Sequence, residues 1–202
     1  ELIRAVVTAE VAEAWGLGFR LLPATEDRLR TMVTLADGDE VGFQEYFVGL
    51  RHDVPVSGIR FDGADDALPG PGVLEAITTA EAVVIAPSNP LVSIAPILAV
   101  PGVRDAVAAR RESAVAVSPI VGGSALKGPA DRMLAEMGHE SSVVGVARLY
   151  RDLVATLVID RVDADLADEV EAEGVRCVVT DTVMRTTEVA AALAETTLGA
   201  VA

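Results

Sequence analysis

The pattern of apolar and polar positions in the first third of the chain predicts a helix followed by short strands. Apolar residues recur at near-helical spacing over residues 1–15. Residues 19–25 predict a short strand, and another strand starting at residue 56 runs into a loop rich in Gly, Pro and Asp. Residues 28–50 predict two strands joined by a hairpin across residues 36–39. The second of these strands is expected to hold most of the aromatic residues, namely Phe43, Tyr46 and Phe47.

From residue 73 onward, short apolar runs alternate with helical patterns. The apolar runs predict four strands, at residues 82–87, 113–119, 155–160 and 175–180. Helices are predicted between and after them, at residues 73–80, through Ile97, from Pro101, and at 129–138, 141–150, 164–173 and 187–198. This alternation is typical of right-handed βαβ units. We therefore predict one α/β domain over residues 1–202, with a mainly parallel sheet and an antiparallel hairpin insertion at about residues 30–62.

Composition refines this picture of the core. Hydrophobic residues make up 51% of the chain, but aromatic residues only 3%. The core must therefore be built from Val, Leu, Ile and Ala, which suits a buried parallel sheet covered by helices.

The charge balance limits the possible partners. The chain has 31 acidic and 16 basic residues, for a net charge of −15. Such a surface repels nucleic-acid phosphates and anionic membranes, and no apolar run is long enough for a membrane span. We expect neither nucleic acid nor membrane as a partner, and a phosphorylated ligand would need local donors or a divalent cation.

Cysteine and histidine offer little candidate chemistry. Cys177 is the one cysteine, so no internal disulfide is possible, and we expect a small core residue in a reducing, cytoplasmic setting. His52 and His139 have no metal-ligand partner at suitable spacing. The chain starts Glu-Leu-Ile-Arg, with neither an initiator Met nor a signal-peptide pattern, so we expect an internal or processed fragment.

The first candidate loop is Pro-Ser-Asn-Pro at residues 87–90, which interrupts an apolar stretch. Ser88, Asn89 and Ser93 carry side chains that can hydrogen-bond a phosphate or the edge of a heterocycle. Helix N-terminal amides favour an anion, and Pro90 stiffens the loop. An ordinary helix-capping turn explains the same residues, and the pattern leaves both interpretations open.

The second candidate loop spans residues 118–129. Gly122 and Gly123 let the backbone approach a ligand, and Lys127 offers a charge for phosphate. The order Lys-Gly-Pro is not a Walker A loop, and the dinucleotide fingerprint G-x-G-x-x-G is absent from the sequence. Asp131 follows in a first helical turn, where it is either a ligand group or a compensation for the helix dipole.

The third candidate loop follows the last predicted strand. Asp181 there can hold Mg²⁺ or a ribose hydroxyl, although capping of the next helix is the favoured interpretation. The acidic run over residues 160–173 predicts a solvated helix face. No G-x-S-x-G elbow supports serine hydrolysis.

Four stretches together resemble the 2-phospho-L-lactate transferase family, which includes phosphoenolpyruvate transferase members. They are RTMVTLADGDEVGFQEYFV, APSNPLVSIAPILAVPGVRDAV, SPIVGGSALKGPADRMLAEMG and TDTVM, in the family's order and within residues 8–198. The resemblance implies a Rossmann-like fold and a Mg²⁺-dependent transferase of deazaflavin coenzyme biosynthesis. A phospholactyl or phosphoenolpyruvyl unit would pass from a guanosine-diphosphate-linked donor to the deazaflavin precursor Fo, with release of GMP.

The resemblance also implies which residues line the ligand cleft. These are Ser88, Asn89, Pro90, Ser93, Gly122, Gly123 and Lys127. A homodimer is expected. The family's Gly-rich first turn and its metal-binding acids have no counterpart in these 202 residues, so no metal ligand is expected in this chain and the Mg²⁺ site would belong to a preceding portion.

Two other functions compete with this interpretation. A non-catalytic relative would bind a nucleotide-sugar-type diphosphate and regulate another process with the same loops. An NAD-binding domain is disfavoured because the glycine fingerprint is missing. A flat slot for the tricyclic Fo ring, beside residues 43–47, would favour the transferase over the regulator.

Overall fold

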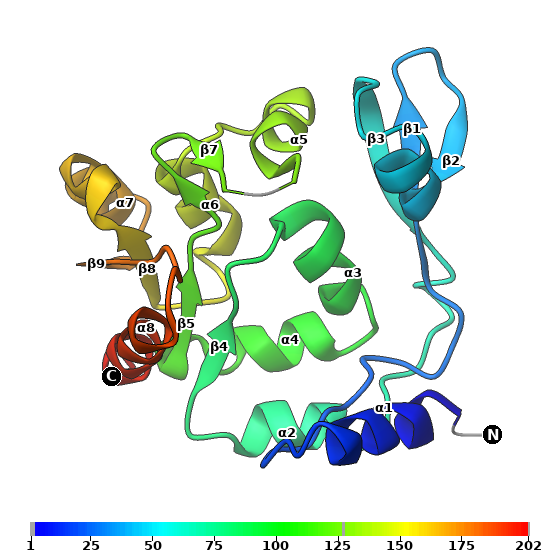
Figure 1. Ribbon diagram of the computed structural model, residues 1–202, viewed down its shortest axis with the longest axis horizontal. Helices are drawn as coiled ribbons and strands as arrows, with labels where there is room; N and C mark the ends of the chain where they lie inside the picture. Colours follow the sequence, from blue (N-terminus) through cyan, green and yellow to red (C-terminus); the bar gives the residue numbers. More distant parts are fainter. Residues whose placement is uncertain (1–2, 127, 202) are drawn as a thin grey trace.

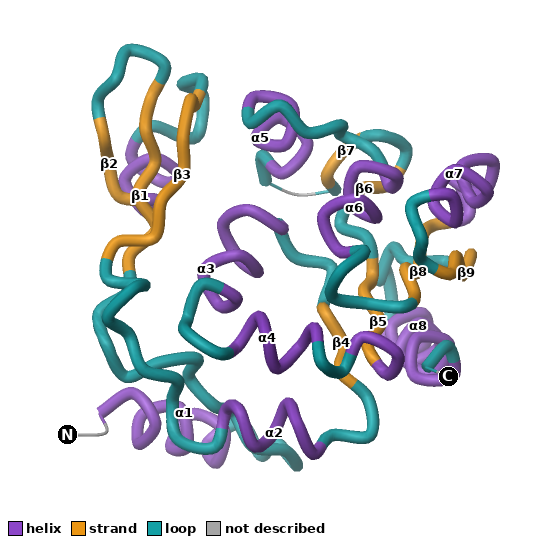
Figure 2. The backbone as a smooth tube through the Cα atoms, turned by 180° about the vertical axis from the view of Figure 1, so that it is seen from behind, coloured by secondary structure: helices purple, strands orange, loops and turns teal. Residues whose placement is uncertain are grey.

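The computed structural model describes residues 3–126 and 128–201, and two sheets carry the fold. Figure 1 shows an antiparallel sheet at one side of the molecule and a parallel sheet toward the other, with α3 and α4 between them. Figure 2 shows the same arrangement from behind. The α/β class, the mainly parallel sheet and the antiparallel hairpin are thus confirmed.

The parallel sheet has the order β4-β5-β8-β9. Its strands are Val83–Ile85, Ala114–Val117, Thr156–Asp160 and Arg176–Thr180, and each neighbouring pair is parallel. β5 and β8 are buried along their whole length, which explains why they read as continuous apolar runs. The four strands that the sequence predicts are therefore confirmed.

Helices cover both faces of the parallel sheet. Alternate residues of β5 and β8 point to opposite faces: Ala116 and Leu157 pack in a cluster with α6, whereas Val115 and Val158 pack against Leu193 of α8. The helices are α1 (Ile3–Ala14), α2 (Val73–Thr79), η2 (Pro90–Ile94), α3 (Ala95–Leu98), α4 (Val103–Ala108), η3 (Arg111–Ser113), α5 (Ala130–Glu136), α6 (Val143–Tyr150), η4 (Arg161–Leu166), α7 (Ala167–Ala172) and α8 (Thr187–Gly199). None of the helices in the described part of the chain is long and apolar enough to cross a bilayer.

The antiparallel sheet has the order β2-β1-β3. Its strands are Glu40–Gly42, Arg30–Leu35 and Val56–Asp62, and the turn between β1 and β2 lies where the sequence predicts it. The aromatic residues, however, do not lie in β2. Tyr46 and Phe47 lie in η1 (Glu45–Gly49), a π-helical turn. Helical spacing brings their rings to the same side as Phe43.

Side-chain contacts tie this antiparallel lobe (residues 30–62) to α5. Val33, Tyr46 and Val56 pack with Met133 in one buried cluster. Arg132 donates hydrogen bonds to the Tyr46 hydroxyl and to the His52 carbonyl. The Glu136 carboxylate accepts the Val56 amide at 3.0 Å. The antiparallel lobe is thus held by both apolar packing and buried polar bonds.

The predicted strand at residues 19–25 is wrong. Thr25 pairs with Pro69 in an isolated bridge, and Pro23 has no N–H to extend a ladder.

The second candidate loop contains a small hairpin that the sequence pattern does not predict. Its strands are β6 (Ile120–Val121) and β7 (Ser124–Ala125). Its two-residue turn requires positive φ at both central residues, which are Gly122 (φ 59°) and Gly123 (φ 76°).

Candidate functional site

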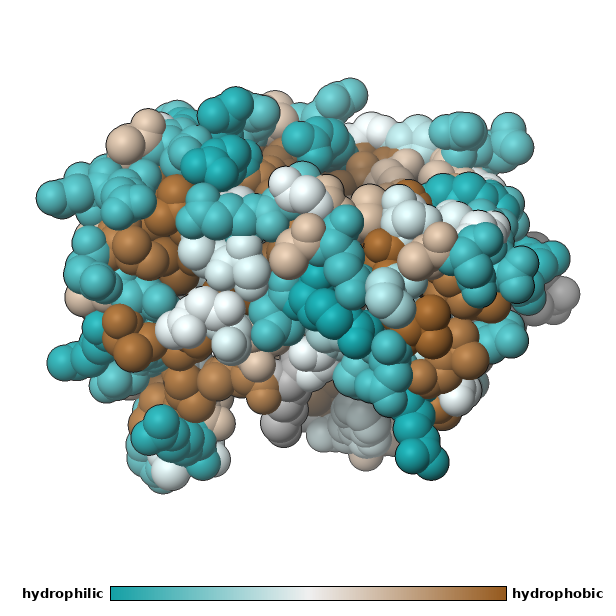
Figure 3. Space-filling model, turned by 90° about the horizontal axis from the view of Figure 1, so that it is seen from above, coloured by the Kyte–Doolittle hydropathy of each residue, from teal (hydrophilic) through white to brown (hydrophobic). Residues whose placement is uncertain are grey.

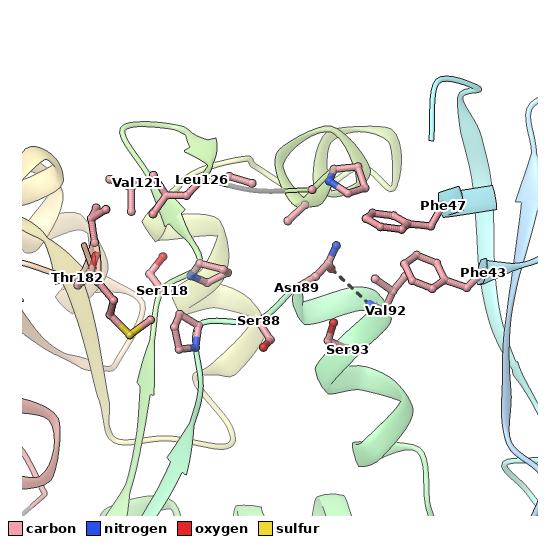
Figure 4. Close-up of a pocket in the computed structure, with 18 residues that line it drawn as sticks. Phe43, Phe47, Ser88, Asn89, Val92, Ser93, Ser118, Val121, Leu126 and Thr182 are labelled. Atoms are coloured by element: carbon pink, nitrogen blue, oxygen red, sulfur yellow. Dashed lines mark hydrogen bonds between the residues drawn. The ribbon is translucent and has the colours of Figure 1, made fainter. Parts of the chain in front are cut away.

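A hollow of about 680 Å³ crosses the carboxyl ends of the parallel strands and reaches the antiparallel lobe. Figure 4 shows it extending from Thr182, past Ser118 and Ser88, to Phe43 and Phe47. Ligands of open parallel sheets bind at this edge, where the loops after neighbouring strands converge. The three candidate loops of the sequence therefore do meet, and all contribute residues to this hollow.

The loop after β4 supplies Ser88, Asn89 and Ser93 to the hollow, as expected. The Asn89 side-chain oxygen Oδ1 caps η2, because it accepts the amides of Leu91 at 2.9 Å and Val92 at 3.4 Å. The Asn89 amide nitrogen makes only a 3.8 Å contact with the Met133 sulfur, so it can still donate to a ligand. The capping interpretation of Asn89 is thus confirmed, and the ligand interpretation stays a prediction for the same side chain. Pro90 is buried under the loop and is not among the lining residues.

The loop after β5 lines the hollow without the Gly122–Gly123 pair. Val121 and Ala125 line the hollow, together with Ser118 and Leu126. Gly122 and Gly123 form the hairpin tip and do not line the hollow. The hairpin turn accounts for their positive φ angles. Lys127 lies outside the described residues, and Asp131 lies in the first turn of α5 without lining the hollow.

The loop after β9 contributes Thr182 in place of Asp181. Thr182 is buried and lines the hollow with Val183 and Met184. The Asp181 side chain is 66% exposed and forms an ion pair with Arg161 at 3.3 Å. Asp181 does not cap α8 either, because Thr186 does so by accepting the Val189 amide. The favoured interpretation of Asp181 as a cap is thus wrong.

An aromatic wall closes the hollow on the side of the antiparallel lobe. The rings of Phe43 and Phe47 are stacked at 5.5 Å between centroids, and Phe47 stacks on His52 at 5.1 Å. Both phenylalanines line the hollow. Phe43 and Val92 also border a second hollow of about 580 Å³, where Arg30 provides a cationic side chain.

The chemistry of the main hollow is neutral over its described lining. Its polar side chains are hydroxyls and one amide, from Ser88, Asn89, Ser93, Ser118 and Thr182, and none of the described lining residues is ionisable. Such a lining binds through hydrogen bonds and ring contacts. The excess acidic charge lies elsewhere, and Figure 3 shows hydrophilic side chains over much of the upper surface, with apolar ones between them.

Two acidic residues of the run over 160–173 are buried, contrary to the predicted solvated face. Asp160 and Asp163 are 9% and 4% exposed. Burial raises the pKa of Asp163, opposed by the hydrogen bond from the Gly122 amide. Burial also tends to raise the pKa of Asp160, but hydrogen bonds from Thr182 and Val162 outweigh it, and the pKa falls below its ordinary value. No local pattern around residues 160–163 predicts this difference, because the donors come from distant loops.

The described residues do not form a metal site. No group of three or more His, Cys, Asp or Glu side chains among them is placed to hold an ion. Asp160 and Asp163 use their oxygens on backbone amides, so they do not fit the octahedral oxygen shell that Mg²⁺ requires. Cys177 is half-buried in β9, as predicted, and burial followed by the charge of Glu171 raises its pKa to about 11. It is therefore a weak nucleophile.

Comparisons with known proteins place the chain in a family. Residues 4–198 match the family model of the 2-phospho-L-lactate transferase CofD. The chain is 44% identical over 196 residues to a phosphoenolpyruvate transferase of Streptomyces griseus, which covers 95% of this chain and 62% of that protein. A phosphoenolpyruvate transferase of Kitasatospora aureofaciens is 43% identical and covers 95% of this chain and 61% of that protein. The chain therefore spans about six-tenths of the length of these relatives.

A solved structure supports the fold independently. A protein of the UPF0052 family from Bacillus halodurans superposes with a TM-score of 0.63 at 19% identity, over 96% of this chain and 66% of that one. The fold and the hollow define an α/β protein with a candidate ligand site at the carboxyl edge of a parallel sheet. The chain belongs to the CofD family of 2-phospho-L-lactate transferases.

Proposed function

We propose that the protein containing this chain transfers a phospholactyl or phosphoenolpyruvyl unit from a guanosine-diphosphate-linked donor to Fo, releasing GMP, in deazaflavin coenzyme biosynthesis. One observation carries the proposal beyond family membership: the same hollow joins an aromatic wall, Phe43 and Phe47, to a row of neutral donors at three strand ends. A tricyclic ring needs the first feature, and phosphate or ribityl oxygens need the second.

The side chains of the hollow suggest a division of roles. Phe43 and Phe47 would stack on the planar acceptor ring. Ser88, Ser93 and the free amide of Asn89 would donate hydrogen bonds to ligand oxygens. Positioning of this kind supplies a large part of catalysis in phosphate-group transfer.

The proposed reaction exchanges one phosphorus–oxygen bond for another. The acceptor hydroxyl oxygen bonds to the phosphorus that carries the acid group, and the bond from that phosphorus to the bridging oxygen breaks. GMP leaves with the electron pair, and the hydroxyl proton passes to a base. Mg²⁺ would offset the charge on the phosphates, but its ligands are expected outside the described residues.

A non-catalytic regulator that binds a diphosphate is the alternative. The absence of ionisable side chains from the described lining favours it, because no general base is present in this part of the site. We further propose a homodimer in a cytoplasmic setting.

The decisive test uses the intact polypeptide that carries this chain. The protein is mixed with the GDP-linked donor, Fo and Mg²⁺, and the product and GMP are followed by mass spectrometry. We expect both to form in equal amounts and to stop forming when Mg²⁺ is chelated. Saturable binding of a diphosphate without turnover would favour the regulator, and a lack of saturable Fo binding in a fluorescence titration would remove the transferase.

A further inference from the structure

Two carboxylate side chains are buried beneath the hollow. Asp160 ends β8, and Asp163 lies in η4 directly after it. Both are buried, although their neighbour Asp165 in the same helical turn is exposed. Burial of a carboxylate is unfavourable unless hydrogen bonds compensate it, so the partners of these two groups indicate what they are for.

Asp163 holds the small hairpin that follows β5. Both of its carboxylate oxygens accept the Gly122 amide, at 3.1 and 2.9 Å. Gly122 is the first residue of the hairpin turn, and the hairpin strands contribute Val121 and Ala125 to the hollow. The carboxylate thus fixes the hairpin to the segment after β8 at one point, next to the lining residues.

Asp160 holds the loop that follows β9. One of its oxygens accepts both the Thr182 amide at 2.8 Å and the Thr182 hydroxyl at 3.0 Å. Its other oxygen accepts the Val162 amide at 3.1 Å, which orients the carboxylate itself. Thr182 lines the hollow, so this bond sets the position of the wall opposite the antiparallel lobe.

We propose that Asp163 and Asp160 are positioning residues of the site, which fix the hairpin and the Thr182 loop at the separation that the ligand requires. The inference rests on the proposed function, because the ligand is taken to be Fo or the guanosine diphosphate donor. Hydrogen bonds to a charged acceptor are stronger than those between neutral groups. One short segment, residues 160–163, therefore sets two of the loops around the hollow.

The test compares Asp163→Ala and Asp163→Asn with Asp165→Ala in the intact polypeptide. Asp165 matches Asp163 in chemistry and helical turn but is exposed. Fo binding is measured by fluorescence and GDP binding by calorimetry. We expect Asp163→Ala to raise the Kd of at least one probe about tenfold, because the hairpin turn loses the hydrogen bond from the Gly122 amide to a charged acceptor. Asp163→Asn retains an acceptor oxygen and should restore binding to within about threefold, and Asp165→Ala should match the parent.

Hydrogen exchange separates positioning from general destabilisation. In Asp163→Ala, the amides of residues 120–125 should lose protection, whereas those of β5 should keep it. Loss of protection in β5 as well, or unchanged binding in Asp163→Ala, overturns the proposal. If the parent protein binds neither Fo nor GDP, the proposed function fails, and with it the ligand half of this inference. The exchange result still decides whether Asp163 holds the hairpin.

Discussion

The two walls of the hollow are built by different means. The wall at the parallel sheet consists of the loops that follow β4, β5 and β9, and buried carboxylates bond two of these loops. The wall at the antiparallel lobe consists of stacked rings on a π-helical turn, which Arg132 ties to α5. The difference suggests that the first wall is fixed by the fold itself, whereas the second depends on packing and a few hydrogen bonds between the antiparallel lobe and α5.

The largest expected effect is on the core beneath the first wall. Leu157 in β8 is fully buried, and Leu157→Ala should lower the free energy of unfolding by about 3 kcal/mol through the lost burial and the cavity left behind. Denaturant titration measures the change, and hydrogen exchange should show protection lost across all four parallel strands. Val179→Ala is the control in the neighbouring strand, because Val179 is 40% exposed and should change stability little. Equal losses in the two variants would contradict a core centred on β8.

The bonds that hold the second wall should come next. Arg132→Met removes the donor to Tyr46 and His52 but keeps much of the side-chain volume. We expect a loss of about 2 kcal/mol, because the Tyr46 hydroxyl and the His52 carbonyl lose a charged donor and keep only their mutual contact at 3.5 Å. The loss should appear mainly as faster hydrogen exchange in β1 and β3, with the parallel sheet unaffected. Arg151→Met is the matched control, since Arg151 is half exposed in a surface ion pair. Faster exchange in β8 as well would show that the two walls are not held separately.

The same contrast explains what the sequence predicts and what it hides. The apolar runs of the parallel strands are local signals, so β4, β5, β8 and β9 follow directly from the pattern. Phe43, Tyr46 and Phe47 stand at helical spacing, but the hairpin signal before them favoured a strand. The sequence pattern thus predicts which loops border the hollow, but not every residue within those loops that lines it.

Two physical causes explain the residues whose placement differs from the sequence prediction. Gly122 and Gly123 are explained by a hairpin turn that pairs only two residues on each side, too short for a periodic pattern. Asp160 and Asp163 belong to an acidic run that predicts a solvated helix face. In the structure both are buried, and their carboxylates accept amides from residues 122 and 182. Such contacts join segments that are far apart in the chain, so composition and local spacing cannot reveal them.

Removal of one ring from the aromatic wall should affect binding more than stability. Phe47→Leu keeps an apolar side chain but removes the stacking surface between Phe43 and His52. If the wall receives the Fo ring, its Kd should rise about tenfold, a value typical of a lost aromatic contact. Fluorescence titration measures the change, and Phe47→Tyr is the control that retains the ring. Unchanged Fo affinity in Phe47→Leu would place the acceptor elsewhere in the hollow.

The smallest effect, and the one that separates the two buried carboxylates, lies in the pH dependence. Hydrogen bonds lower the pKa of Asp160 below 3.8, so its stabilising contribution is present above that value and is lost as the pH falls through the lowered pKa. Burial raises the pKa of Asp163, so its contribution is fully present below 3.8 and is lost as the pH rises through the raised pKa. The two groups therefore act on stability in opposite directions during acidification.

Asparagine variants make this opposition measurable. At about pH 7, Asp160→Asn should destabilise the protein by about 1 kcal/mol, and Asp163→Asn by less, because it also relieves the burial of a charge. As the pH falls toward about 4, the deficit of Asp163→Asn relative to the parent should grow, because the parent gains from protonation of Asp163. The deficit of Asp160→Asn should shrink only as the pH falls below 3.8, through the lowered pKa of Asp160. Urea titrations at several pH values measure both differences. Parallel changes in the two variants would mean that the carboxylates titrate as one unit, and that residues 160–163 do not hold their two loops independently.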